Sequence, residues 1–139
     1  MTPEEIRQRV RERLQEQRAL VEDLLRRRAQ LAGSLFVRFG VCGKEGCVCR
    51  TGQKHGPYYV LSTRSAGKGG FSYLDAEQMG EARELVRAYR DYRSGMRRLR
   101  KLGEQLVVLL HRYQEVSTRQ GTRRVGLPPQ PQAQKNELQ

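Results

Sequence analysis

Three cysteines and one histidine lie close together in the sequence, and side chains of these types can hold a metal ion. Cys42, Cys47 and Cys49 fall within eight residues, and His55 follows six residues later. Three thiolates and one imidazole complete the tetrahedral coordination of structural zinc and leave no position open for water or substrate. The glycines between these residues allow the tight turns that such short spacing needs. We therefore predict one structural zinc ion per chain, bound by these four residues, here called the Cys/His cluster.

Other interpretations of the cysteines remain open. The spacing C-x4-C-x-C-x5-H is not a common zinc-finger spacing, so the prediction rests on ligand chemistry. A disulfide would leave one thiol unpaired, a redox site would need one activated cysteine, and an iron–sulfur cluster usually takes a fourth cysteine. The three residues could also be plain thiols. His111 is the alternative fourth ligand, although it lies far along the chain.

The net charge of the chain points to a polyanionic partner. The 139 residues include 27 Lys and Arg against 15 Asp and Glu, a net charge of +12. Residues 33–74 hold six basic side chains and a single acidic one, Glu45, whereas residues 1–32 and 75–116 are nearly balanced. Most of the basic residues are arginine, whose guanidinium donates two hydrogen bonds to a phosphate at once. A GC-rich genome would also enrich arginine, but the charge favours nucleic acid, most simply DNA.

Two long helices are expected to flank the cluster, over residues 3–32 and 75–116. Thr2 with Glu5, and Asp75 with Gln78, have the spacing of capping boxes. Apolar or neutral residues follow at alternating steps of four and three, which predicts an antiparallel coiled-coil hairpin. These positions are Val10, Leu14, Gln17, Val21, Leu24 and Leu31 in the first helix and Leu85, Tyr89, Tyr92, Met96, Leu99, Gly103, Leu106, Leu110 and Tyr113 in the second.

Two features of the helices bear on their packing. Gly103 lies on the heptad positions, where it indicates either close approach of the two backbones or a kink. A two-helix hairpin would leave Leu20, Leu25 and Leu109 on an exposed flank, so we expect a homodimer through the coiled coil.

The segment between the helices is expected to be a compact zinc-knuckle and β-hairpin module. Residues 34–41 have a weak strand pattern, and residues 57–64 and 71–74 are β-formers separated by a glycine-rich turn. The predicted fold class is therefore mainly α with a small β-hairpin. Its ranges are 1–32 (first helix), 33–74 (module), 75–116 (second helix) and 117–139, a basic Pro- and Gln-rich tail predicted to be disordered.

The module also carries the residues expected to contact nucleic acid. Aromatic side chains can stack on bases and basic side chains can follow phosphates. Because strand residues alternate between faces, Tyr58 and Tyr59 cannot both lie in the core. Alternatively, the aromatic side chains of one strand face pack on the zinc knuckle and the helices instead of contacting nucleic acid. The candidate nucleic-acid-binding residues are Arg38, Lys44, Arg50, Lys54, Tyr58, Tyr59, Arg64, Lys68 and Tyr73.

The module resembles a family of small bacterial proteins of unknown function that are often encoded near transposases in mobile elements. The resemblance is carried by Gly33-Ser34-Leu35, Arg38, Cys42-Gly43-Lys44, Cys47, Cys49, His55-Gly56-Pro57-Tyr58-Tyr59 and Leu61-Ser62. It implies a zinc-binding, DNA-associated protein with a transposase or recombinase as a possible partner. The hairpin is also similar to the arm-type DNA-binding domains of tyrosine recombinases, but no recombinase catalytic domain follows it.

The preferred function is an accessory DNA-binding protein, and the alternative is a coiled-coil adaptor that binds a transposase without touching DNA. We expect no enzyme, because the sequence shows no nucleophile–base pair or carboxylate cluster. We expect no membrane helix, because there is no run of 18 apolar residues. The first residues do not resemble a secretory signal, so a cytoplasmic protein is expected. The sequence distinguishes neither DNA from RNA nor single from double strands.

Overall fold

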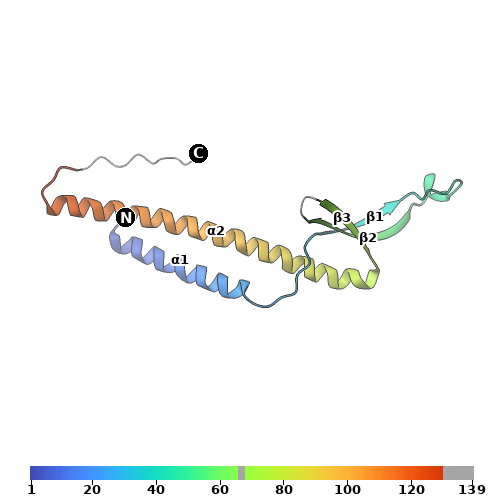
Figure 1. The fold of residues 1–139 in the computed structure, drawn as a ribbon, viewed down its shortest axis with the longest axis horizontal. Coiled ribbons are helices and arrows are strands. Elements are labelled where there is room, and N and C mark those ends of the chain that lie inside the picture. The colour runs from blue at the N-terminus through green and yellow to red at the C-terminus, as the bar shows by residue number, and fades with distance from the viewer. Residues whose placement is uncertain (66–67, 130–139) are drawn as a thin grey trace. The chain divides into compact units, whose positions relative to one another are not determined.

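The computed structural model describes residues 1–65 and 68–129, without the side chains of residues 64, 65 and 68. The elements are α1 (Pro3–Leu24), β1 (Ser34–Gly40), a short 3₁₀ helix (Val48–Arg50), β2 (His55–Ser65), β3 (Lys68–Leu74) and α2 (Ala76–Arg124), as Figure 1 shows. The fold is thus mainly helical, as predicted, with three strands rather than a hairpin. The chain forms two compact units: a helical unit of residues 1–26 and 95 onward, and a sheet unit of residues 27–94.

Both helices begin where their capping boxes predict. The Thr2 backbone N–H donates to the Glu5 carboxylate at 2.6 Å, and the Glu5 N–H donates to the Thr2 hydroxyl at 3.2 Å. The hydrogen bond from the Thr2 backbone N–H holds the pKa of the Glu5 carboxyl below its usual value. Asp75 and Gln78 exchange the equivalent bonds at 2.7 and 3.0 Å. These reciprocal bonds satisfy backbone donors that a helix start would otherwise leave unpaired.

The first helix ends at Leu24, eight residues before the predicted end at residue 32. The predicted heptad spacing continues from Leu24 to Arg28, a charged residue that interrupts the apolar pattern before Leu31. Leu31, predicted to lie on the helix, instead uses its backbone N–H to donate to the carbonyl of Leu85 at 3.0 Å. Residues 27–33 therefore connect α1 to the sheet and contact α2 on the way.

The second helix runs past Ser117, where the tail was predicted to start, and ends at Arg124. Thr118 and Thr122 donate their hydroxyls to carbonyls one turn earlier, at 2.9 and 3.0 Å. Gly126 then adopts φ +69°, and the N–H groups of Gly126 and Leu127 bond back to Arg123 and Thr122. This is a Schellman motif, which shows that Gly126 ends the helix. The rest of the predicted tail, residues 130–139, lies outside the described chain.

In the helical unit, α1 contacts the second part of α2 with opposite chain direction. Arg7 bonds to Tyr113, Glu16 pairs with Arg98, and Leu24 lies beside Gly95. The Arg98 guanidinium lowers the pKa of the Glu16 carboxyl, which Arg13 also contacts at 2.9 Å. The partners descend along α2 as they ascend along α1, so the two helices are antiparallel here.

The buried positions of these helices follow alternating steps of three and four residues, but in a different register from the predicted one. Leu14 and Val21 in α1 are exposed, and so are Met96 and Leu110 in α2. Positions that follow these steps and are buried or half-buried are Ile6, Val10, Arg13, Gln17, Leu20 and Leu24 in α1, and Gly95, Leu99, Leu102, Leu106, Leu109, Tyr113 and Val116 in α2; six of them, Val10, Gln17, Leu24, Leu99, Leu106 and Tyr113, were predicted. The sequence allowed both registers because apolar residues stand side by side, as in Leu109 and Leu110.

Close approach of the helices occurs at Gly95 and not at Gly103, where it was suspected. A Cβ atom added at Gly95 would lie 2.7 Å from the Leu24 side chain, whereas one added at Gly103 would have no described neighbour within 4 Å. The prediction of an exposed flank at Leu109 was also wrong, because Leu109 is buried; Leu20 is half-buried and Leu25 is exposed.

The sheet unit contains one antiparallel sheet of order β1-β2-β3. The predicted hairpin is β2 with β3, and β1 adds to the other edge of β2, with Phe36 opposite Val60. Leu61 on the sheet and Met79, Ala82 and Val86 on α2 are buried in this unit. No helix in residues 1–65 and 68–129 has the apolar length that crossing a bilayer requires.

The register of the helical unit makes a testable prediction. Leu102 is 0% exposed and Leu110 is 55% exposed, although the sequence pattern places only Leu110 on the heptad positions. We expect Leu102→Ala to lower the free energy of unfolding by about 2–5 kcal/mol, because it removes a buried side chain. Leu110→Ala, the matched control, should change it by under about 0.5 kcal/mol. Urea unfolding followed by circular dichroism measures both; equal losses would contradict this register.

Candidate metal centre

The four residues of the Cys/His cluster come from the loop between β1 and β2. Cys42 follows the end of β1, Cys47 precedes the short 3₁₀ helix, Cys49 lies within it, and His55 is the first residue of β2. Gly56 next to His55 has φ +134°, and a Cβ there would lie 2.8 Å from the Phe39 ring and 2.9 Å from the Arg38 carbonyl oxygen. Only glycine fits this position, so Gly56 lets β2 start close enough to β1 for His55 to reach the cysteines.

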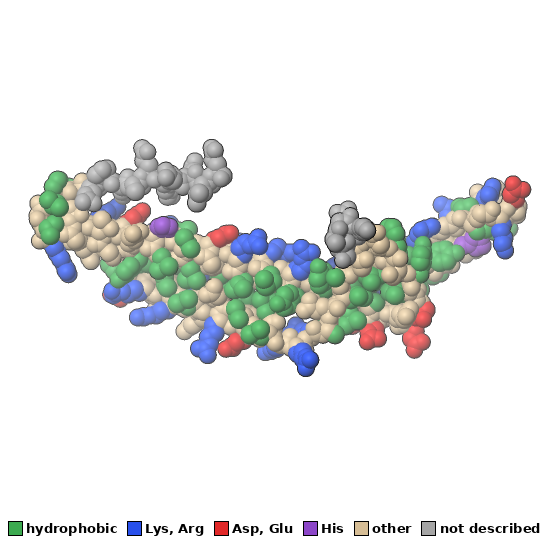
Figure 2. Space-filling view, viewed as in Figure 1, with side chains coloured by type: hydrophobic (Ala, Val, Ile, Leu, Met, Phe, Trp, Pro, Cys, Tyr) green, Lys and Arg blue, Asp and Glu red, His purple; other side chains and the backbone are tan. Residues whose placement is uncertain are grey.

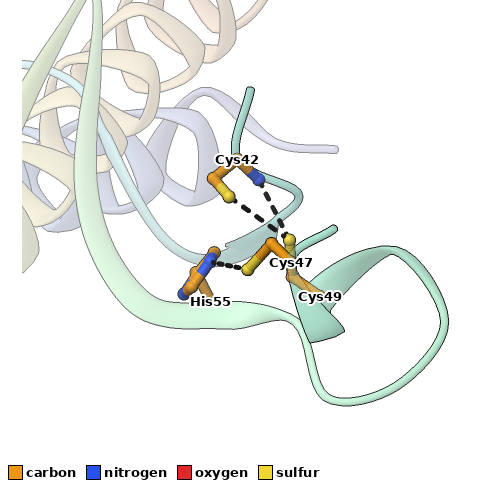
Figure 3. A group of neighbouring side chains, drawn as sticks. All are labelled: Cys42, Cys47, Cys49 and His55. Carbon is orange, nitrogen blue, oxygen red and sulfur yellow. Dashed lines mark hydrogen bonds between the residues drawn. The ribbon is translucent and has the colours of Figure 1, made fainter. Parts of the chain in front are cut away.

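The four side chains point toward one another, as Figure 3 shows. One ligand atom from each residue lies within 4.8 Å of the other three. The sulfurs of Cys42 and Cys49 are 3.5 Å apart, and the Cys47 sulfur is 3.3 Å from Nε2 of His55. Around a tetrahedral zinc ion, bond lengths of about 2.3 Å to sulfur and about 2.0 Å to nitrogen place sulfurs roughly 3.8 Å apart and sulfur and nitrogen roughly 3.5 Å apart. The cluster therefore has the size of a four-ligand metal site.

Burial differs among the four ligand residues. Cys49 is only 2% exposed, whereas Cys42 and Cys47 are half-buried and His55 is exposed. The backbone N–H of Cys42 donates to the Cys49 sulfur at 3.3 Å. Such an N–H bond stabilises a thiolate, as the backbone around a structural metal site commonly does. One ligand is thus fixed by the backbone while His55 closes the site from the solvent side.

The local bonds shift the pKa values of two thiols in opposite directions. A hydrogen bond from the backbone of Cys49, followed by bonds from the Cys49, Cys42 and His55 side chains, lowers the pKa of Cys47 to about 6. Burial raises the pKa of Cys49. Cys47 therefore loses its proton more readily than Cys49, which has to lose its proton when a metal binds.

The geometry bears on two of the alternatives for the cysteines, the disulfide and the His111 ligand. All three are free, and the 3.5 Å between the Cys42 and Cys49 sulfurs is far longer than the roughly 2.05 Å of a disulfide. His111, the alternative ligand, is exposed on α2 and does not belong to the cluster. The structure thus brings together the four residues predicted as ligands, which could bind a metal ion.

The structure places the predicted nucleic-acid-binding residues in three groups and leaves the side chains of two of them undescribed. Arg38, Tyr58 and Tyr73 lie together on one sheet face, where Arg38 donates to the Tyr73 hydroxyl at 3.3 Å. Tyr59 is half-buried on the opposite face, so Tyr58 and Tyr59 do separate as the alternation requires. Lys44, Arg50 and Lys54 are exposed in the loop of the Cys/His cluster. The side chains of Arg64 and Lys68 lie outside the described part of the structure.

Two aromatic residues that were not among the predicted site residues belong to the first group. Phe36 and Phe71 lie on the same face as Tyr73, and their rings meet edge to face at 6.2 Å. Alternation along residues 34–41 places Phe36 and Arg38 on the same side of the strand. Only the pairing of β1 with β2 puts that side next to Tyr58 and Tyr73.

Comparison with known proteins gives a family but no activity. The family model described as a domain of unknown function, DUF6788, matches residues 4–84, which is more than half of the chain. No curated protein and no solved structure shows significant similarity to the chain. The match agrees with the resemblance to a family of unknown function. The proximity to transposase genes stays a prediction from that resemblance.

The cluster predicts one bound metal ion per chain. Cys49→Ser should lose the ion, because it removes the buried sulfur ligand, whereas His111→Ala should keep it. Elemental analysis of protein purified without chelator measures the metal content, and the thiolate-to-metal absorption of the cobalt-substituted protein reports sulfur ligation. Metal-free wild-type protein, or a Cys49→Ser variant with full metal content, would contradict the assignment.

The metal affinity should fall as the pH falls, because thiol and imidazole ligands must lose their protons to bind a metal. Each proton that binding displaces costs about tenfold in affinity per pH unit. As the pH falls through about 6, the Cys47 thiolate also takes up a proton, so the fall in affinity should steepen. Competition with a chromophoric chelator between pH 5 and 8 measures this slope. A Cys47→Ser control should bind more weakly and show a shallower slope, because one competing proton is removed; an unchanged slope would contradict the role of Cys47.

Proposed function

We propose a function for this chain, which belongs to the DUF6788 family of unknown function: its sheet unit is a zinc-stabilised module that binds nucleic acid. Zinc is the metal that the ligands favour, because three thiolates and one imidazole in a closed four-ligand site are typical of structural zinc. A closed site leaves no open position for catalysis. Zinc would therefore supply fold stability to the loop between β1 and β2 rather than chemistry.

The observation that carries the proposal is the excess of positive charge in residues 33–74, which hold six basic side chains and one acidic one. Some arginines of the helices pair with acidic side chains one turn away, as Arg18 does with Glu22 and Arg87 with Glu84. Among the described residues, no ion pair includes Lys44, Arg50 or Lys54. Figure 2 shows Lys and Arg side chains around the end of the sheet unit that carries the cluster. Unpaired cations on a rigid loop attract phosphates without first breaking protein ion pairs.

The helical unit supports the module in this proposal. Its steps of three and four residues and its antiparallel contacts favour an antiparallel coiled-coil hairpin. We favour DNA over RNA as the ligand, because the chain resembles proteins that are encoded near transposase genes. The cation-rich loop itself would serve for either DNA or RNA.

A second candidate function rests on the surface of the helices. Leu14, Val107, Val108 and Leu110 are exposed in the helical unit, where they would favour a second copy of the chain or a protein partner such as a transposase. In this candidate the chain is an adaptor, and the zinc site only stabilises the sheet unit.

A charge-reversal experiment tests the first candidate. We expect Lys44→Glu/Arg50→Glu/Lys54→Glu to weaken binding and to reduce the slope of log affinity against log salt by about 2–3, because each phosphate contact contributes about 0.9. The matched control, Arg97→Glu/Arg100→Glu/Arg112→Glu, changes the net charge equally on exposed positions of α2 and should keep the slope. Fluorescence anisotropy with labelled oligonucleotides measures both, with zinc content as the folding check.

The outcomes separate the two candidates. If both triple variants lose binding equally, net charge alone explains the affinity and the module is not the binding site. Wild-type protein that binds neither single-stranded nor duplex probes at low salt would overturn the first candidate and favour the adaptor.

A further inference from the structure

One face of the sheet carries an unusual set of aromatic side chains. Residues directly opposite each other on neighbouring strands share a face. The pairing places Phe36, Val60 and Tyr73 in one row, with Phe71 on one side of the row and the pair Arg38 and Tyr58 on the other. We call the side chains of Phe36, Arg38, Tyr58, Phe71 and Tyr73 the aromatic face.

The aromatic face is open to solvent. Phe71 is 69% and Tyr73 60% exposed, and Phe36, Tyr58 and Arg38 are also exposed. Val60, between Phe36 and Tyr73 on this face, is only 1% exposed. On the opposite face, Leu61 is buried and Tyr59 is half-buried, whereas Val37 is 45% exposed. The aromatic side chains of the first face are thus exposed around a buried valine.

The exposed rings are held in place by one another. Phe36 and Phe71 meet edge to face at 6.2 Å, and Tyr58 and Tyr73 do so at 6.3 Å. Arg38 donates to the Tyr73 hydroxyl, which fixes a cation beside the rings. A ligand that stacks here would meet rings whose orientation is already restricted, which lowers the entropy cost of binding.

A pocket joins the aromatic face to the Cys/His cluster. It has a volume of about 400 Å³, within the roughly 300–1,000 Å³ of small-ligand sites. Its lining consists of Arg38, Gly40, Val41, Cys42, Tyr58 and Tyr73. Two tyrosines and a guanidinium are the groups that accept a flat base and its phosphate.

The face favours single strands over a duplex. In a duplex the bases are stacked on each other and offer only their edges in the grooves, whereas a single strand can place the flat surface of each base on an aromatic ring. Exposed apolar rings add little to duplex binding, which depends on phosphate and base-edge contacts. The cations Arg38, Lys44, Arg50 and Lys54, exposed in the same unit, complement the charge of the strand.

We infer that the aromatic face and its pocket bind single-stranded nucleic acid, with bases stacked on Tyr58, Tyr73 and the two phenylalanines and with Arg38 on the backbone or on a base. The inference rests on the proposed function and names its ligand class. The same surface chemistry serves DNA and RNA, so the experiment includes both.

The test compares labelled oligothymidylate and oligouridylate of about 16 nucleotides with a DNA duplex of the same length. The zinc-loaded wild-type protein should bind at least one single strand more tightly than the duplex. Tyr58→Ala and Tyr73→Ala should each weaken single-strand binding at least about fivefold, the lower limit for loss of one stacked base. Tyr73→Phe keeps the ring and should stay near wild type. Tyr92→Ala, an exposed tyrosine on α2, is the matched control and should not change binding.

A second measurement uses a substitution that keeps an aromatic ring at its position. The chain has no tryptophan, so Phe71→Trp places a single tryptophan, which can be excited selectively, on an exposed position of the aromatic face. Single strands should quench this fluorescence by stacking, and the duplex should not.

The outcomes distinguish this inference from the proposed function. Tighter duplex binding, with no effect of the tyrosine variants and no quenching, would overturn the single-strand inference and leave nucleic-acid binding by the loop intact. No binding of any probe would overturn both. A change of oligomeric state in Tyr58→Ala, without a change in binding, would show that a second copy covers the aromatic face and would also overturn the inference.

Discussion

The convergence of four donor atoms on one point is the constraint on which the sheet unit depends. The loop between β1 and β2 has little apolar packing of its own: Val41 and Val48 are exposed, and Cys49 is its one buried residue. A segment of this size does not acquire a fixed shape from such packing. The Cys/His cluster links the end of β1 to the start of β2, and these two strands set the register that creates the aromatic face. The geometry of the Cys/His cluster, strand pairing and surface chemistry are therefore parts of one arrangement, which a bound metal ion would stabilise.

Positive charge is unevenly distributed along the chain. Some of the helix arginines form ion pairs, as Arg13 and Arg98 do with Glu16. These pairs add little stability individually, because exposed pairs are screened by water and salt. Residues 33–74, by contrast, hold six basic side chains and a single acidic one, Glu45. A polyanion would therefore meet a localised attractive field rather than a uniformly basic molecule.

The sequence predicted the features that depend on neighbouring residues. Both capping boxes formed, because Thr2 and Asp75 need only a partner three residues on. The Cys/His cluster formed from residues within one loop. The helix register could not be predicted in the same way, since adjacent apolar residues such as Leu109 and Leu110 satisfy two alternative heptads and only the packing of α1 against α2 selects one. The end of α1 at Leu24 likewise depends on the bond from Leu31 to Leu85, which is distant in sequence.

The aromatic face could not be predicted from the sequence for the same reason. The alternation along β1 and β2 predicts which residues of each strand share a side, but the addition of β1 to the edge of β2 is a non-local pairing that no short pattern specifies. Phe36 was consequently missed as a partner of Phe71 and Tyr73, although each of these strands was recognised. The candidate residues Arg38, Tyr58 and Tyr73 were predicted for their chemistry, and only the sheet explains why they lie together.

The length of α2 has a consequence for how the protein unfolds. Its first turns belong to the sheet unit and its later turns to the helical unit, so one continuous helix is stabilised by two different sets of contacts. The two parts of α2 then need not unfold together. If the sheet unit loses its order, the contacts between α1 and the later turns of α2 remain. Unfolding can then depart from two-state behaviour and pass through a partly helical species, in which the later turns of α2 persist while its first turns fray.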